Sequence, residues 1–418
     1  MHTPAVPEHS GSAGPATTGG LDEPVVAIER LVAGGAGLAH ESSGRVVLVD
    51  GGLPGERVRV RITEERSRMA KGVVTAVLEA SPSRVEPPCV ELALGCGGCD
   101  LQHVAAAAQP RLKADVVRDA LWQPVSRGEI DEVPVRDGPA LSPWRYRSTV
   151  RCAVDGDRLA FHRRRSDELL AVGDCVVAHD LVAEVIRDGR FPGAREVTVR
   201  AGTRTGERVV VVDPMATDDV VVPDGVRVIG VDELRRGRRA WYHEIVDGRR
   251  FRISAQSFFQ SGAEGAEALV DAVRRAAGPI VATDRLVDLY GGVGLFAATL
   301  GAVQPILVER SASSVADARV NLAGSGARIV RSAVERWRAS PADVVIADPS
   351  RVGLGRDGVR AVSATGARRV VLVSCDVASL ARDLVLLAGS GYRATGIDVV
   401  DLFPNTHHVE AVTCLEPA

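Results

Sequence analysis

Apolar runs and amphipathic segments alternate along the last part of the chain, residues 256–418. Runs such as RLVDLY, DVVIADP and RRVVLVSC are typical of buried strands, and AEGAEALVDAVRRAA and VASLARDLVLLAGSG have the spacing of amphipathic helices. This alternation predicts an α/β domain with a doubly wound parallel sheet. The final run, HHVEAVTCL, follows only a short link, so we expect it to be antiparallel and at or near a sheet edge.

Residues 23–82 have a strand pattern instead. Strict alternation in RVRVRI and VVTAV, with turn signals at Gly51-Gly52 and Pro54-Gly55, predicts a small OB-like antiparallel β-barrel. Between these two regions, runs such as RSTVRCAV, REVTVRAG and ERVVVVD alternate with turns. We therefore interpret residues 83–255 as a mostly β, mostly antiparallel central domain, with one helix over AAAAQPRLKADVVRDAL near its start.

A length of 418 residues fits two or three such domains. Residues 1–22 are rich in Ala, Gly, Pro, Ser and Thr, which predicts a disordered tail. We find no long apolar stretch and no basic N-terminal region followed by an apolar core, so we expect neither a membrane span nor a signal peptide. The expectation is a cytoplasmic protein without membrane contact, and no obligate protein partner is evident.

The segment LVDLYGGVGLFAATL predicts a buried strand, a glycine turn and a helix. Glycines allow a ligand to approach the backbone, and a helix N-terminus offers free N–H groups. Glu309 ends the next strand, where a carboxylate can accept hydrogen bonds from ribose hydroxyls. The pattern fits S-adenosylmethionine, a nicotinamide dinucleotide, or simply a tight turn. Ala297 fills the third glycine slot of the dinucleotide pattern, which favours a nucleoside cofactor without pyrophosphate.

Three reactive side chains lie at the ends of predicted strands. Asp348 follows DVVIA, Cys375 follows VVLVS, and Glu410 enters the last strand. The ligand crevice of an open α/β sheet lies beyond the carboxyl ends of its strands, so we expect these side chains to converge there. Each also has an ordinary interpretation, as a buried small thiol, a turn aspartate before proline, or a solvated glutamate.

Three of the seven cysteines, Cys89, Cys96 and Cys99, have C-x6-C-x2-C spacing. An odd total argues against a disulfide framework, and the crowding predicts a metal site with Cys175 as the fourth ligand. Four thiolates suit either a [4Fe-4S] cluster or zinc, and the ligand type alone does not separate the two. Three unrelated thiols are the remaining alternative.

Local arginine-rich stretches stand out against a net charge of −3, which by itself does not indicate a nucleic-acid partner. These stretches are candidates for phosphate contacts, although a charge run is more often a solvated face. They span residues 145–147, 162–165 and 235–239.

Several motifs, in one order along the chain, resemble those of the RNA uracil-5-methyltransferases with an N-terminal TRAM domain. They are the cysteine loop with DLQH at 89–103, SFFQ at 257–260, DLYGGVG at 288–294, DPSR at 348–351, SC at 374–375 with LARD at 380–383, and DLFPNTHHVE at 401–410. The resemblance runs from about residue 24 to the end. It implies a class I methyltransferase (Rossmann-like) domain at 256–418, a TRAM barrel and a mostly β central domain.

The resemblance implies methyl transfer from S-adenosylmethionine to C5 of a uridine in structured RNA, with ribosomal RNA favoured over transfer RNA. Cys375 would add to C6 of the base and form a covalent adduct that activates C5. Glu410 would then remove the C5 proton so that the thiol can leave. A catalytically degenerate protein that binds or remodels RNA on the same scaffold is the alternative, and a small-molecule C-methyltransferase is disfavoured.

The same resemblance implies the binding residues. Phe258 or Phe259 would stack on a base turned out of its helix, and Arg351 would contact the thiolate, a phosphate or the base. It also favours a [4Fe-4S] cluster over zinc, with a structural or RNA-positioning role. The positions that match the family's cofactor site are Gln260, Tyr290, Glu309 and Asp348.

The sequence departs from the family pattern around the cofactor. Ser350 replaces the second proline of the usual DPPR, and Gly291 stands where YCG has its cysteine. Leu295 replaces a residue that is often polar, and Ser261-Gly262 follows SFFQ where a residue and asparagine are common. These departures leave both expected catalytic residues in place but bear on cofactor affinity.

Overall fold

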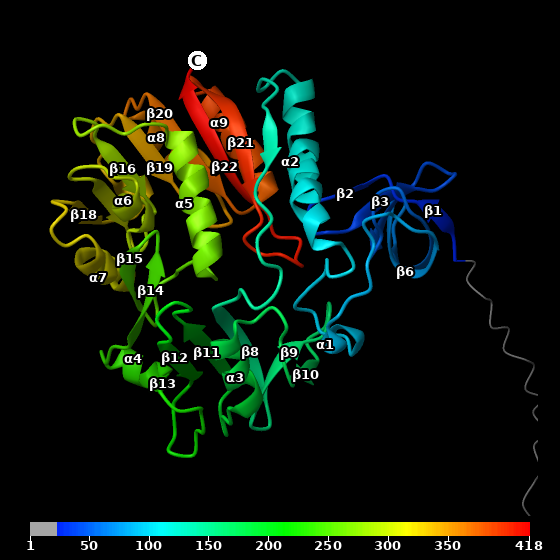
Figure 1. The fold of residues 1–418 in the computed structure, drawn as a ribbon. Helices are drawn as coiled ribbons and strands as arrows, with labels where there is room; N and C mark the ends of the chain where they lie inside the picture. The colour runs from blue at the N-terminus through cyan, green and yellow to red at the C-terminus, as the bar shows by residue number, and fades with distance from the viewer. Residues whose placement is uncertain (1–22) are drawn as a thin grey trace, which may run out of the picture.

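The computed structural model describes residues 23–418, and the predicted disordered tail, residues 1–22, lies outside the described residues. These described residues form two six-stranded sheets, an eight-stranded sheet and a two-stranded hairpin. In Figure 1 the N-terminal sheet, in blue, lies beside helix α2 (Gln109–Ser126), and the green central sheet lies below the C-terminal sheet, in yellow to red. No helix of the described part is long and apolar enough to cross a membrane.

The N-terminal sheet has the strand order β1-β5-β6-β4-β3-β2, at the place of the predicted small barrel. Its pairs are antiparallel as predicted, except that β4 and β6 are parallel. In β5, Val58 and Val60 are fully buried while Arg57, Arg59 and Arg61 are exposed, which is the period of a half-buried strand. The strands are β1 (Val25–Ala27), β2 (Arg30–Leu31), β3 (Gly37–His40), β4 (Val46–Asp50), β5 (Arg57–Glu65) and β6 (Met69–Glu79).

The central sheet has the order β10-β9-β8-β11-β12-β13, and its pairs are antiparallel except β12 with β13. Helix α3 packs against it through Val182, Val185 and Ile186. The expected mostly β central domain is therefore present. Its elements are α1 (Val90–Ala93), β8 (Thr149–Asp155), β9 (Arg158–His162), β10 (Leu169–Ala171), α3 (Asp180–Asp188), β11 (Glu196–Ala201), β12 (Arg208–Asp213), β13 (Val226–Gly230) and α4 (Val231–Arg235).

The C-terminal sheet has the order β18-β17-β16-β19-β20-β22-β21-β7. The first five strands are mutually parallel, whereas β22 is antiparallel to both of its neighbours and has β21 and β7 outside it. Apolar cores on both faces make it the doubly wound sheet that the sequence predicts. Its elements are α5 (Ala263–Ala277), β16 (Leu286–Leu289), α6 (Leu295–Thr299), β17 (Ile306–Glu309), α7 (Ala312–Asn321), β18 (Arg328–Arg331), β19 (Val344–Ala347), α8 (Gly355–Ser363), β20 (Arg369–Ser374), α9 (Val377–Ala388), β21 (Tyr392–Val400) and β22 (Glu410–Pro417).

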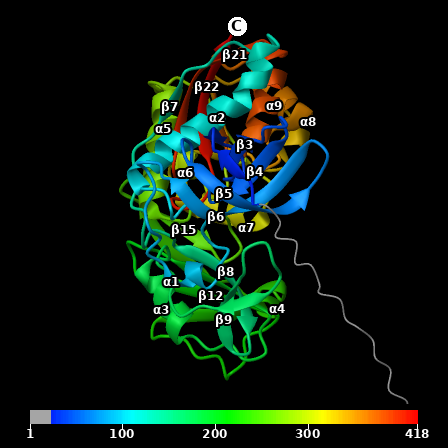
Figure 2. The same ribbon diagram turned by 90° about the vertical axis from the view of Figure 1, so that its right-hand side faces the viewer.

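One segment assigned to the central domain from the sequence belongs to the C-terminal sheet instead. Strand β7 (Val135–Asp137) pairs in parallel with β21, and the preceding helix α2 buries Val117 and Leu121 in the core on one face of that sheet. Lys113 of α2 also forms a buried ion pair with Asp401, with 2.5 Å between Nζ and Oδ1. The C-terminal domain is therefore discontinuous in sequence. Figure 2 shows the blue N-terminal strands lying in front of α2, above the green central sheet.

A hairpin of β14 (Trp241–Val246) and β15 (Arg249–Ser254) leads from the central sheet into the C-terminal domain. Tyr242, Phe251 and Ile253 are buried in the core shared with α5. This packing fixes the start of the loop 255–262, which contains the SFFQ motif.

Candidate active site at the carboxyl edge of the C-terminal sheet

Cys375 and Glu410 lie side by side at the carboxyl edge of the C-terminal sheet. Strands β20 and β22 pair in a register that sets Ser374 opposite Ala411, so the next pair along the sheet is Cys375 and Glu410. Asp348 follows the adjacent strand, β19. Glu410 is 5% exposed, whereas Cys375 is only partly buried. The structure therefore brings the three side chains together and leaves the thiol accessible.

The electrostatics of this edge favour a bound cation. Burial and the charges of Glu410 and Asp348, opposed by the charge of Arg351, together raise the pKa of Cys375 to about 12. Burial also raises the pKa of Asp348 to about 7. The pKa of Glu410 is well above its usual range because the carboxyl is buried and Asp348 is close. A positive charge bound here would relieve this repulsion between acidic groups.

Glu309 and the glycine loop lie beside this edge, at the ends of β16 and β17. The carboxylate of Glu309 accepts hydrogen bonds from the backbone N–H groups of Gly292 (3.2 Å) and Ser311 (2.6 Å). Gly292 needs a left-handed conformation, with φ of 53°, and Tyr290 adopts a similar one at 59°. The Tyr290 hydroxyl donates to Glu335 at 3.2 Å. The hydrogen bonds from Gly292 and Ser311 hold the Glu309 carboxylate at the carboxyl ends of the strands.

Asp288 is an acidic residue of this region that begins the DLYGGVG motif, and the sequence alone did not predict a role for it. It is fully buried in β16, and one carboxylate oxygen accepts the Ala297 N–H at 3.0 Å. Burial, opposed by that hydrogen bond and supported by the charges of Asp348 and Glu309, raises its pKa to about 7. Its other oxygen, Oδ1, has no hydrogen-bond partner among the described residues. The sequence feature that could have identified Asp288 is an aspartate within an apolar run that predicts a buried strand.

The structure accommodates three of the departures from the family pattern. A Cβ atom on Gly291 would lie 2.7 Å from Cγ of Leu307, so the space for the usual cysteine side chain is occupied by this leucine. A Cβ atom on Gly262 would lie 2.7 Å from the carbonyl oxygen of Tyr146. Leu295, a third departure, is 7% exposed and packs in the core. At these three positions, the residue present in this chain therefore fits the space that its neighbours leave.

The DPSR loop is held by the helix that follows Cys375. Ser379 donates to the carbonyl oxygen of Arg351 at 2.7 Å. Asp383, fully buried in the LARD motif, accepts the N–H groups of Leu354 (2.6 Å) and Gly355 (3.1 Å). Helix α9 thereby fixes the loop that contains Asp348 and Arg351.

The two phenylalanines of SFFQ have different surroundings. Phe258 is 69% exposed, whereas Phe259 is 5% exposed and lies 6.0 Å from the ring of Phe251. Gln260, next in the chain, is 9% exposed. The loop is anchored because the Ser257 hydroxyl donates to the buried carboxylate of Asp317 at 2.6 Å. Of the two aromatic rings, only that of Phe258 is free to stack on a ligand.

Comparison with known proteins identifies the family. The TRAM domain family matches residues 25–75. The chain is 37% identical over 435 residues to an uncharacterized RNA methyltransferase of Streptomyces avermitilis, covering 95% of this chain and 99% of that protein. It is 30% identical over 428 residues to the 23S rRNA (uracil(1939)-C(5))-methyltransferase RlmD of Shewanella amazonensis, covering 93% of this chain and 94% of that protein. The chain belongs to the RNA uracil-C5-methyltransferase family.

The fold of this RNA methyltransferase also matches a solved structure. The tRNA (uracil-54, C5)-methyltransferase of Pyrococcus abyssi, in complex with S-adenosyl-L-homocysteine, aligns with a TM-score of 0.70 and 23% identity. The alignment covers 93% of this chain and 99% of that one. The predicted class I methyltransferase fold with an N-terminal TRAM barrel is confirmed.

Four cysteines of the methyltransferase, those expected to bind metal, lie in one neighbourhood. Burial raises the pKa of Cys99 to about 12, a value that includes an opposing hydrogen bond from Gln102 and smaller contributions in the same direction from Cys175, Cys96 and Cys89. Burial also raises the pKa values of Cys96 and Cys175, and Cys89 adds to both. Within residues 23–418, however, no group of three or more His, Cys, Asp or Glu side chains is arranged to hold a metal ion. The thiols converge but do not form a closed ligand set.

The arginine-rich stretches are partly occupied by ion pairs within the protein. Arg165 contacts Asp50 of the barrel at 2.7 Å, and Arg164 lies 3.5 Å from the same carboxylate. Arg145 contacts Asp174 at 2.6 Å. The stretch at 162–165 therefore connects the central domain to the barrel, which reduces the number of its cations available for phosphate.

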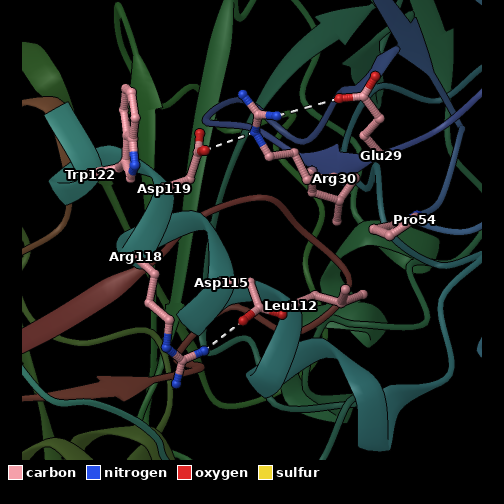
Figure 3. A pocket seen from close by; sticks show the side chains of 9 residues that line it. Glu29, Arg30, Pro54, Leu112, Asp115, Arg118, Asp119 and Trp122 are labelled. Carbon is pink, nitrogen blue, oxygen red and sulfur yellow. Dashed lines mark hydrogen bonds and ion pairs between the residues drawn. The ribbon is translucent and has the colours of Figure 1, made fainter. Parts of the chain in front are cut away.

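The described residues also form two hollows, and none of the predicted catalytic, cofactor-binding or metal-binding residues lines them. One, of about 370 Å³, separates the barrel from α2 (Figure 3), where Arg30 contacts Asp119 at 2.8 Å and Arg118 contacts Asp115 at 2.6 Å. Glu29 gives this hollow an excess of acidic side chains, which does not suit phosphate. The other, of about 410 Å³, lies between the central and C-terminal domains.

Proposed function

We propose that this methyltransferase transfers a methyl group from S-adenosylmethionine to C5 of a uridine in structured RNA through a covalent adduct with Cys375. The observation that carries the proposal is the position of Cys375 and Glu410, one residue beyond the Ser374–Ala411 pair of β20 and β22 and next to Asp348. A nucleophile and a base on neighbouring strand ends can reach C6 and C5 of one pyrimidine ring.

The residues of the site fit the cofactor. Glu309, fixed by two N–H groups, is placed to accept from ribose hydroxyls, and the glycine loop allows close approach. Asp348 and the unpartnered oxygen of Asp288 supply negative charge for the cofactor's amine and sulfonium. Gln260 and Tyr290 complete the proposed cofactor set. The cofactor, when bound, supplies an electrophilic methyl group on a positively charged sulfur.

The proposed reaction proceeds in three balanced steps. The Cys375 thiolate would add to C6 of uracil, and the electron pair of the C5–C6 bond would become an enolate. C5 of the enolate would take the methyl group, and the electron pair of the broken methyl–sulfur bond would stay on the sulfur, which leaves as a neutral thioether. Glu410 removes the proton from C5. The C6–S bond then breaks, which restores the double bond and the thiolate. Arg351 favours the thiolate, because its charge lowers the pKa of the thiol.

An exposed aromatic ring supports RNA as the substrate. The reacting uracil has to leave its helix to reach a pocket, and the ring of Phe258 is available to stack on a base. The relative RlmD of Shewanella amazonensis, named for a 23S rRNA uracil, supports ribosomal over transfer RNA. The TRAM barrel and the central domain are the proposed RNA-binding units.

We also propose that Cys89, Cys96, Cys99 and Cys175 bind a [4Fe-4S] cluster, with zinc as the alternative. The clustering of four thiols supports this ligand set, and the Gly98 N–H donates to the sulfur of Cys96 at 3.5 Å. Methyl transfer by the proposed route requires no electron, so the expected role is structural. Protein purified without oxygen should contain iron and acid-labile sulfide, both lost in Cys96→Ala; zinc in their place would overturn the cluster.

The test of the proposed function uses RNA transcripts that contain 5-fluorouridine. Fluorine cannot leave as a cation, so a working enzyme with tritiated S-adenosylmethionine stalls as a labelled protein–RNA adduct that survives denaturing gels. The adduct should form with the wild type and be absent from Cys375→Ala. RNA binding without any adduct in the wild type would favour the degenerate RNA-binding alternative.

A further inference from the structure

The loop 401–409, which leads into Glu410, is held by a segment far away in sequence. The carbonyl oxygen of Asn405 accepts the N–H groups of Asp100 (3.1 Å) and Leu101 (3.0 Å). Gln109 pairs with Asn405 in both directions, at 2.6 Å from the Asn405 N–H to Oε1 and 3.1 Å from Nε2 to Oδ1. Both side chains are buried, so moving the loop breaks several buried hydrogen bonds.

A second tie joins the side chain of Asp100 to the same loop. The carboxylate of Asp100 is hydrogen-bonded to Nδ1 of His407, and the Asp100 side chain is 18% exposed. The His407 ring lies 4.4 Å from that of His408, and His408 lies 5.8 Å from the ring of Phe403. Glu410 begins β22 two residues after His408. A displacement of His407 would therefore also move Glu410 at the start of β22, because only two residues separate them.

The TRAM barrel contributes to this junction as well. Gly35 approaches His407 so closely that an added Cβ atom would lie 2.8 Å from the Cβ of His407 and 3.6 Å from Oδ2 of Asp100. Gly35 also has a φ of 79°, which favours glycine. Loops from the barrel, the cysteine region and the catalytic domain thus meet at one histidine.

We propose that Asp100, the residue directly after Cys99, is a positioning residue that holds Glu410 in place for removal of the C5 proton. It acts through His407 and through the backbone of Asn405. The proposal rests on the proposed function, in which Glu410 is the base. It also gives the cysteine loop a purpose in a reaction that needs no electron, because a folded loop is what presents Asp100.

The reaction sequence provides a specific readout for this role. The C6–S bond can break only after the C5 proton has left, so a misplaced Glu410 leaves methylated RNA attached to Cys375. With ordinary uridine RNA and tritiated S-adenosylmethionine, Asp100→Ala should accumulate ~10-fold more labelled covalent adduct than the wild type. Its kcat should fall by a similar factor, with KM for S-adenosylmethionine unchanged. Asp100→Asn, whose amide oxygen can still accept from His407, should restore release.

Asp343→Ala is the matched control. Asp343 accepts the Arg285 N–H at 2.8 Å on the opposite edge of the sheet, so its removal frees a backbone segment without touching the junction. It should leave adduct levels as in the wild type. If Asp100→Ala does not fold, Gly35→Ala displaces His407 from the barrel side and should accumulate the same adduct.

Two results would overturn the role of Asp100. One is a variant that loses adduct formation and product release together while keeping the wild-type melting temperature. The other is a variant that turns over normally without accumulating adduct. The 5-fluorouridine experiment separates this from the proposed function: a wild type that forms no adduct there overturns the chemistry itself, whereas a wild-type adduct leaves only the role of Asp100 in question.

Discussion

Phe258 and Phe259 are neighbours in sequence but differ in what surrounds them. The exposed ring of Phe258 is available for a base, and Phe259 is packed against Phe251. Phe258→Ala should weaken RNA binding by ~1–3 kcal/mol, the range for loss of one aromatic stack, without changing stability. Phe259→Ala should instead lower the free energy of unfolding by ~3–5 kcal/mol. Filter binding and urea unfolding of both variants test this, and equal effects on RNA binding would contradict it.

Cys375 is predicted to be a poor nucleophile until a cation binds beside it. Because burial and the charges of Glu410 and Asp348 raise its pKa to about 12, the thiolate is scarce at neutral pH. The rate of Cys375 alkylation by iodoacetamide should therefore keep rising with pH and reach no plateau below pH 10 (about two units under that pKa). Mass spectrometry of the peptide that contains Cys375 measures this rate.

Two comparisons test whether neighbouring negative charge contributes to the raised pKa of Cys375. Glu410→Gln removes one of the charges that raise the pKa of Cys375, so its alkylation at a given pH should be faster. Sinefungin, which carries an amine where the cofactor has its sulfonium, should lower the apparent pKa, whereas neutral S-adenosylhomocysteine should lower it less. A plateau near pH 8 in the free wild-type protein would contradict the argument.

At the scale of elements, regular periodicity made most of the catalytic domain predictable. The helix expected over AEGAEALVDAVRRAA is α5 itself, and each apolar run named there became a strand. Strand β7 was missed because its three residues, VRD, have no apolar pattern and become a strand only by pairing with β21. Helix α8 was missed because GRDGVRAVS carries two glycines, which lower its helix propensity.

The site residues also divide into those that the sequence predicts and those that it does not. Positions at strand ends, such as Cys375 and Asp348, follow from topology, because parallel strands share a carboxyl edge. The contacts of Asp383 and of Asp100 could not be predicted, since each joins segments that meet only in the folded chain. A local pattern contains no information about such partners.

The cofactor loop allows a prediction about an element. Gly291→Ala places a methyl group 2.7 Å from Leu307, so it should lower the free energy of unfolding by ~1–3 kcal/mol through overpacking. In a Leu307→Ala background the same change should cost less, because the space has been vacated. A double-mutant cycle in urea measures the coupling, and additive effects would show that the contact is not responsible.

At the scale of the whole molecule, the three domains are joined by contacts that cross the sequence. Arg165 joins the central domain to the barrel through Asp50, and Lys113 of α2 pairs with Asp401 in the interior. Burial lowers the pKa of Lys113, and the nearby Asp401 opposes this shift. Removing either Lys113 or Asp401 would leave an uncompensated buried charge. This pair therefore fixes α2 against the catalytic sheet.

The discontinuous C-terminal domain leads to a final prediction about folding. Residues 240–418 contain the hairpin and most of the sheet but lack α2 and β7, so the fragment leaves uncovered the surface where Val117 and Leu121 pack. Each of these buried side chains contributes ~1.5–3 kcal/mol, a large part of a domain's net stability. The fragment alone should therefore lack a cooperative urea transition. Joining residues 105–140 to it through a flexible linker should restore one, whereas equal transitions for the two fragments would mean that α2 and β7 are an appendage.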